Sequence, residues 1–97
     1  MYRIIDSRAS GKTSRLMLLA KETGATIVCS NPRAMEAKAH AYGIVGIDFM
    51  DYATYLNTKG MDCGKIMIDE MEAFVKFTIG SNCGQSELIG YTLSNGD

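Results

Sequence analysis

Apolar residues along this chain gather in short runs, separated by stretches in which they recur at helical spacing. Short runs of apolar and β-branched residues are typical of strands in a sheet that helices cover. The runs that we expect to form strands are residues 2–6, 25–30, 43–47, 65–69 and 87–94. Helices are therefore expected in the intervals between these runs.

The first two intervals carry start and stop signals of helices. In the first interval the apolar residues at helical spacing are Leu16, Leu19 and Ala20. That helix is expected to end at Gly24, because glycine adopts the left-handed conformation that closes many helices. Asn31 is a suitable N-cap for the second helix, Pro32 fits its first turn, and Gly43 lies past its end.

The later intervals predict two more helices. After a cap at Asp48, the apolar face of the third helix is formed by Phe49, Tyr52, Ala53 and Leu56. Residues 57–64 contain two glycines among polar residues, so we expect a loop there. The inner face of a fourth helix, ending at Gly80, is formed by Met71, Phe74, Val75 and Thr78.

The alternation of strands and helices determines the fold class that we expect. It requires a parallel sheet with helices on both faces and right-handed crossovers, and hence a three-layer α/β fold. We predict a mostly parallel sheet of four or five strands, in which the strand at 65–69 is buried on both faces. The length of 97 residues, with 46% hydrophobic and 22% charged, suits a single domain over 1–97.

Charge and hydropathy narrow the range of partners. A formal net charge of -1 at pH 7 gives the chain no overall attraction to nucleic acid or to a membrane surface. No apolar run approaches the length that crosses a bilayer, and the first residues carry charges where a signal peptide needs its apolar segment. We expect a cytoplasmic protein, in the host cytoplasm if its gene is viral, with no membrane partner. Any nucleic-acid contact would have to be local.

The cysteines do not indicate a metal site. Cys29, Cys63 and Cys83 are widely spaced, form no C-x-x-C pair and are accompanied by one histidine, His40. We expect three reduced thiols, with Cys29 as a small buried residue inside a strand.

The segment DSRASGKT, residues 6–13, links a predicted strand to a predicted helix. Free backbone N–H groups at a helix start bind phosphate, and Gly11 lets the phosphate approach closely. Lys12 can place a positive charge on terminal phosphate oxygens, and the Thr13 hydroxyl is a suitable Mg²⁺ ligand. The residues expected to line a nucleotide are Ser7, Arg8, Ala9, Ser10, Gly11, Lys12, Thr13 and Ser14. An ordinary glycine turn is the alternative interpretation.

The segment KIMIDE, residues 65–70, ends in two carboxylates that follow an apolar strand. Ligands of open α/β sheets bind at the carboxyl ends of the strands, where we expect Asp69 and Glu70 to lie. Asp69 would support Mg²⁺, and Glu70 would orient and deprotonate an attacking water. An acidic pair at a helix start is the simpler interpretation of these residues alone.

Together the two segments resemble the Walker A and Walker B motifs of P-loop NTPases. The Asp-Glu ending is similar to the division of that family that uses a catalytic glutamate and an added strand, which includes helicases. In size and pattern the chain also resembles small P-loop proteins encoded by bacteriophages. One departure is Asp6, which stands where the P-loop pattern has its first glycine. A carboxylate there would repel phosphate unless it turns away.

The resemblance implies that ATP, or GTP, is bound with Mg²⁺ and hydrolysed slowly. Lys12 and Glu70 would be the catalytic residues, and Thr13 and Asp69 the metal ligands. Residues of the last predicted strand and its end that would sense phosphate are Thr92, Ser94 and Asn95. No arginine is identified as a finger, so a protein partner or a second copy of the chain would have to supply one.

Two other activities remain open from the residues. The first is a nucleotide-binding interaction module without turnover, which engages a host or viral protein; Asp6 and the missing arginine favour it. The second is phosphoryl transfer to a nucleoside or nucleotide, although the chain is short for an acceptor pocket and a lid.

Overall fold

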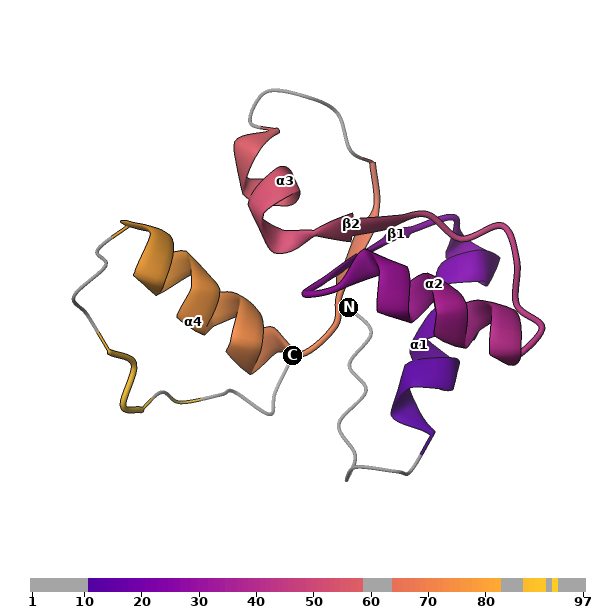
Figure 1. The fold of residues 1–97 in the computed structure, drawn as a ribbon, viewed down its shortest axis with the longest axis horizontal. Coiled ribbons are helices and arrows are strands. Elements are labelled where there is room, and N and C mark those ends of the chain that lie inside the picture. Colours follow the sequence, from indigo (N-terminus) through magenta and orange to yellow (C-terminus); the bar gives the residue numbers. More distant parts are fainter. Residues whose placement is uncertain (1–10, 59–63, 83–86, 91, 93–97) are drawn as a thin grey trace.

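The computed structural model of the protein describes residues 11–58, 64–82, 87–90 and 92, with only the backbone of Lys12, Ser81 and Asn82. Its elements follow one another along the chain as helix and strand in alternation (Figure 1). They are α1 (Lys12–Thr23), β1 (Thr26–Cys29), α2 (Pro32–Ala41), β2 (Phe49–Asp51), α3 (Tyr52–Asn57), β3 (Ile66–Ile68) and α4 (Met71–Asn82). The strand expected at 2–6 lies outside the described residues.

The strands form a parallel sheet in the order β2-β1-β3. Cys29 of β1 is in register with Asp51 of β2, and Val28 is in register with Ile68 of β3. The expected α/β class with a parallel sheet is confirmed. The expected four or five strands are not: the described part of the chain contains three.

One face of the sheet carries the main hydrophobic core. Alternate strand residues point to the same face, so Ile27 of β1 shares that face with its register partners Phe49 and Met67. Helices α1 and α2 pack against it through a cluster of buried residues (Figure 1). The buried members are Met17, Ala20, Ile27, Cys29, Met35, Ala39 and Ile44. Val28 is also fully buried but points to the opposite face.

The helix signals of the first half of the chain are confirmed. Gly24 closes α1 in the left-handed conformation, with φ 77°, and donates its N–H to the carbonyl of Ala20. The Asn31 side chain accepts the N–H of Ala34 and caps α2, whose first residue is Pro32. Gly43 follows the end of α2 with φ 74°. These local signals suffice because each residue satisfies its own helix end.

The third strand and helix differ from the prediction. Residues 43–47 are not a strand, because Gly43 and Gly46 have positive φ values of 74° and 86°, which turn the backbone away from an extended course. The strand is instead β2, so Phe49 belongs to a strand and not to a helix. The cap of α3 is Asp51, which accepts the N–H of Thr54, and not Asp48.

The second half of the chain brings three more corrections. Helix α4 continues through Gly80 to Asn82, because a helix interior tolerates a single glycine. Residues 87–90 and 92 form no strand. Strand β3 is half-buried along its length and is paired with β1 on one side, and in the described part of the chain nothing pairs with its other side.

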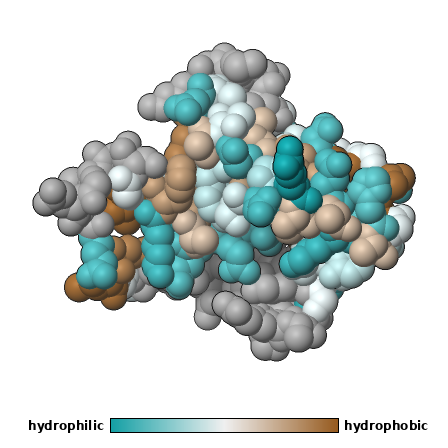
Figure 2. Space-filling view, viewed as in Figure 1, coloured by the Kyte–Doolittle hydropathy of each residue, from teal (hydrophilic) through white to brown (hydrophobic). Residues whose placement is uncertain are grey.

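The surface mixes polar residues with several exposed apolar ones (Figure 2). On α4, Met71 and Phe77 are 52% and 37% exposed. Other large apolar side chains that are exposed are Leu18, Tyr42, Val45 and Ile89. Across the described ranges, we find no helix with the length and apolarity needed to pass through a bilayer.

Candidate functional site

Asp69 directly follows β3 and lies at the carboxyl edge of the sheet. Its backbone N–H donates to the carbonyl of Val28 at 2.9 Å, which continues the β1–β3 ladder by one residue. Because Cys29 is in register with Asp51, the edge carries Asp51, Cys29 and Asp69 side by side on three adjacent strands. The predicted position of Asp69 at the carboxyl edge of a parallel sheet is therefore confirmed.

Glu70 has an unusual backbone conformation for its residue type. Its φ of 60° is the only positive value at a non-glycine residue in the described part of the chain. The left-handed region costs an L-residue about 1–2 kcal/mol, so surrounding contacts must hold Glu70 there. Its carbonyl accepts the N–H of Phe74 at 3.0 Å and so begins α4. The Glu70 side chain is exposed.

Tyr52, the first residue of α3, binds the backbone of the two acids. Its hydroxyl donates to the carbonyl of Asp69 at 2.7 Å and lies 3.4 Å from the carbonyl of Glu70. The Tyr52 ring is 4% exposed and lies 5.3 Å from the Phe74 ring in a T-shaped arrangement. Burial, the charge of Asp69 and further charges nearby raise the pKa of Tyr52 to about 12. The hydroxyl is therefore protonated and able to donate near neutral pH.

Cys29 is a buried thiol with carboxylates on both sides. Burial raises the pKa of Cys29 to about 11; the charge of Asp69 and, more weakly, that of Asp51 act in the same direction. The thiol is thus protonated near neutral pH and a poor nucleophile. The prediction that Cys29 is a small buried residue is confirmed. Cys63 and Cys83 lie outside the described residues.

The start of α1 is the only part of the predicted phosphate-binding segment within the described residues. Gly11 precedes the helix with φ 82° and provides no side-chain cap. The N–H of Arg15 donates to the Gly11 carbonyl, so the earlier N–H groups of the first turn have no partner within the helix. The Ser14 hydroxyl donates to the same carbonyl at 2.9 Å. Thr13 is half-buried in this first turn.

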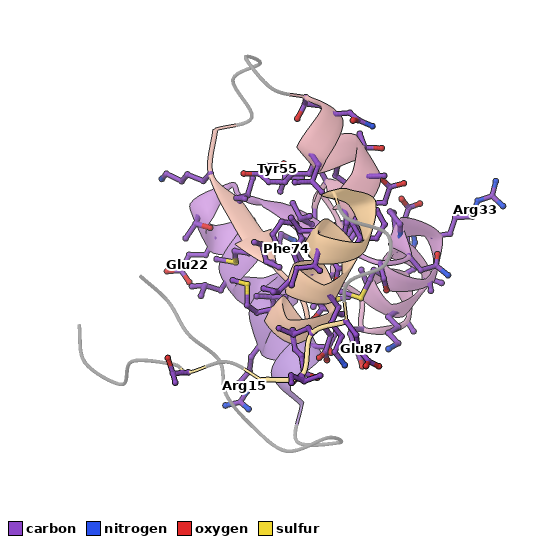
Figure 3. The ribbon with its side chains drawn as sticks, turned by 90° about the vertical axis from the view of Figure 1, so that its left-hand side faces the viewer. Arg15, Glu22, Arg33, Tyr55, Phe74 and Glu87 are labelled. Atoms are coloured by element: carbon purple, nitrogen blue, oxygen red, sulfur yellow. The ribbon has the colours of Figure 1, made fainter. Side chains whose placement is uncertain are left out.

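The predicted site residues divide into those that the structure brings together and those that it does not. Asp69 and Glu70 lie with Cys29 and Tyr52 at the carboxyl edge. In Figure 1 the start of α1 lies at the lower end of the view, the end toward which β3 runs. Arg15 of α1 lies in the lower part of Figure 3. Among the described residues, no hydrogen bond joins Thr13 to this acidic pair.

Several predicted residues lie beyond what the structure describes. They are Ser7, Arg8, Ala9, Ser10, Ser94, Asn95 and the side chain of Lys12. Thr92 is exposed and belongs to no strand. Arg33 is exposed and points into solvent, as a helix-start arginine commonly does (Figure 3).

Sequence reasoning did not find the role of Tyr52 or of Asp51. Tyr52 was expected to be an ordinary packing residue of a helix. Asp51 stands three residues before Thr54, whose N–H it accepts, and this spacing is typical of a helix N-cap. Had this signal been used, the helix would have been predicted to begin at Tyr52, directly after a strand.

Within the described ranges, no three histidine, cysteine, aspartate or glutamate side chains come together as a metal site. Comparison of the chain with known protein families, curated proteins and solved structures finds no match in any of the three.

Proposed function

We propose that the protein binds a nucleoside triphosphate, ATP or GTP, and hydrolyses it slowly with Mg²⁺, using a P-loop type of site within a three-layer fold. One observation carries this proposal: a Gly-Lys-Thr segment begins a helix whose N-cap is Gly11, in a parallel α/β chain in which Asp69 and Glu70 directly follow strand β3. The start of α1 and the acidic pair are both required. N–H groups and a lysine alone would bind an anion, whereas hydrolysis also requires a carboxylate near the attacking water.

Phosphate binding would be the task of the first turn of α1. The N–H groups of that turn and the positive end of the helix dipole favour an anion, and Gly11 leaves room for one. Lys12 would add a point charge at the terminal phosphate oxygens. Ser14 and the loop residues 7–10 would complete the lining.

The donors on the chain suit Mg²⁺ chemically. Mg²⁺ prefers oxygen ligands and usually keeps several waters, so one hydroxyl and one carboxylate from the protein are sufficient. Thr13 and Asp69 offer these two groups, and the backbone of Asp69 is fixed by its bond to Val28. When bound, the ion would neutralise charge on the phosphates.

Glu70 would act as the general base. Its exposed carboxylate would take a proton from a water as that water attacks the terminal phosphorus, and the leaving oxygen would depart on the nucleoside diphosphate. Without an arginine directed at the transferred phosphoryl group, turnover by the isolated chain is expected to be slow. A protein partner or a second copy that supplies an arginine would accelerate it.

Calorimetry tests the site before any question of turnover. We expect wild type to bind ATP or GTP more tightly with Mg²⁺ than without it, and Lys12→Ala to lose at least about tenfold in affinity, since a charge-assisted phosphate contact contributes more than 1.4 kcal/mol. Lys21→Ala, at the opposite end of α1, is the matched control and should bind like wild type. Equal affinity of Lys12→Ala and wild type would refute the site.

Turnover is measured separately. Glu70→Gln should bind nucleotide like wild type but hydrolyse it at least about a hundredfold more slowly, because the amide cannot accept the proton. Release of phosphate at the same rate by both proteins would refute the assignment of Glu70.

A binding module without turnover is the second candidate. The exposure of Met71 and Phe77 on α4, close to the acidic pair in the chain, favours it, because a partner could cover this apolar surface. Tight nucleotide binding with no turnover at any protein concentration would support this candidate, whereas turnover that rises with concentration would support hydrolysis by an oligomer.

A further inference from the structure

Tyr52 lies outside both sequence motifs, yet its side chain bonds to the backbone of the acidic pair. It belongs to α3, and its hydroxyl reaches across to the carbonyls of Asp69 and Glu70 at 2.7 and 3.4 Å. We propose that Tyr52 is a positioning residue that holds Glu70 in the orientation required for hydrolysis. This inference rests on the proposed function, and it adds to it a residue that the motifs do not contain.

The backbone of Glu70 explains why such a residue is needed. A glutamate with φ 60° is strained and keeps that conformation only if neighbouring groups fix it. The Glu70 carbonyl is fixed from one side by the Phe74 N–H. The Tyr52 hydroxyl fixes the peptide groups on both sides of the Glu70 Cα, since it contacts one carbonyl before it and one after it.

The surroundings of Tyr52 make this contact rigid. Its ring is almost completely buried and packs edge-on against Phe74, and the Phe77 ring lies 5.7 Å away. Both phenylalanines belong to α4, the helix that Glu70 begins. Tyr52 therefore clamps the end of β3 and the start of α4 together, and with them the backbone that carries the Glu70 side chain. Because the hydroxyl is buried, losing its bond to the Asp69 carbonyl would leave the hydroxyl itself without a partner, which is costly.

Tyr52→Phe removes the hydroxyl and leaves the ring contacts in place. We expect this variant to bind Mg-ATP within about twofold of wild type and to lose about tenfold in the rate of hydrolysis under single turnover, since a misdirected base lowers kcat and not affinity. Tyr55→Phe is the matched control: it removes a hydroxyl from the same helix, and its ring contacts the same Phe74 at 6.3 Å. Its hydrolysis should equal that of wild type.

A spectroscopic readout tests the same contact without any nucleotide. The ¹³Cα and ¹³Cβ shifts of Glu70 report its left-handed backbone, and in Tyr52→Phe they should move toward values of ordinary conformations. Replacing Tyr52 by 4-aminophenylalanine keeps an N–H donor at the ring's far end. This replacement should restore both the shifts and most of the hydrolysis rate, which a purely structural role of the ring would not require.

The possible results separate this inference from the proposed function. If wild type binds no nucleotide, the proposed function fails, and the Glu70 shifts still decide whether Tyr52 positions that residue. If wild type hydrolyses ATP and Tyr52→Phe does so equally fast, the inference is overturned while the proposed function stands. Unchanged Glu70 shifts in Tyr52→Phe would also overturn it. If Tyr52→Phe does not fold, as judged by circular dichroism, the 4-aminophenylalanine protein decides: wild-type shifts support the clamp and altered shifts contradict it.

Discussion

At the scale of single residues, one of the most informative positions is Glu70, where the backbone departs from the conformation that its residue type prefers. Glu70 occupies a backbone region that glycine would occupy at lower cost, directly at the end of β3. Strain of this kind persists where neighbouring groups over-determine the conformation and where function benefits from it.

Glu70→Gly should therefore stabilise the fold relative to Glu70→Ala. Both variants lose the carboxylate and its contacts, so their difference reports the backbone alone. We expect the glycine variant to be more stable by about 1 kcal/mol, since the left-handed strain of alanine outweighs the larger chain entropy of unfolded glycine. Urea denaturation measures the difference. A glycine variant no more stable than the alanine variant would mean that the conformation at residue 70 is not strained.

At the scale of elements, helix ends are set by side chains that accept backbone N–H groups. Asp51 caps α3 through a bond to the Thr54 N–H, and Asn31 does the same for α2 through Ala34. Both caps accept the N–H of the residue three positions later, but only Asp51 carries a charge. The bonds from Thr54 lower the pKa of the Asp51 carboxyl below its usual value of 3.8.

The Asp51 cap should give stability that is lost in acid. Because the pKa of Asp51 is lower in the folded than in the unfolded protein, its contribution is present above pH 3.8 and disappears as the pH falls through the folded pKa. Asp51→Ala should lose about 1 kcal/mol at neutral pH. Asp51→Asn should keep the cap but lose the pH dependence, since the amide does not titrate. Thermal unfolding of wild type and Asp51→Asn between pH 6 and about pH 2.5 measures this; parallel curves would contradict it.

The elements also show what the sequence could predict and why it failed elsewhere. Helices α1 and α2 were predictable because Gly24, Asn31 and Pro32 act through their own backbone neighbours. The third unit was not, because an apolar run such as 43–47 fits either a strand or a packed turn. Ile44 of that run is buried, as it would be in a strand. Positive φ at Gly43 and Gly46 nevertheless excludes a strand there. That choice depends on tertiary packing, not on local pattern.

In the candidate site, too, features set by local sequence were predictable and features set by tertiary packing were not. The position of Asp69 at the carboxyl edge was predictable, since it follows directly from a strand in a parallel sheet. The contact of Tyr52 with the acidic pair was not, because it joins residues 17 and 18 positions apart through the packing of α3 on β3 and α4. No spacing rule within one element relates them.

At the scale of the whole molecule, two buried groups at the carboxyl edge, a thiol and a phenol, favour the folded state only while they are protonated and neutral. Cys29 on the central strand lies between the carboxylates of Asp51 and Asp69, and Tyr52 packs beside them. Deprotonating either the thiol or the phenol would place a buried negative charge next to existing ones. The native state resists this, and the unfolded chain does not.

Alkaline pH should therefore unfold the protein cooperatively. The pKa of Cys29 is raised from 9.0 to about 11 and that of Tyr52 from 10.0 to about 12, so each contribution is complete below the unfolded value and is lost as pH rises through the folded one. Between pH 9 and 11 the Cys29 thiol alone should lower the free energy of unfolding of wild type by about 2 kcal/mol, or its Tm by about 10 °C.

Cys29→Ala should be less stable at pH 7, because it leaves a small cavity in the core, but its Tm should fall less steeply with pH. In Tyr52→Phe the flattening should begin one unit higher, above pH 10. If both variants follow the wild-type slope, the thiol and phenol do not carry the charge conflict, and the three strands are not coupled through this edge.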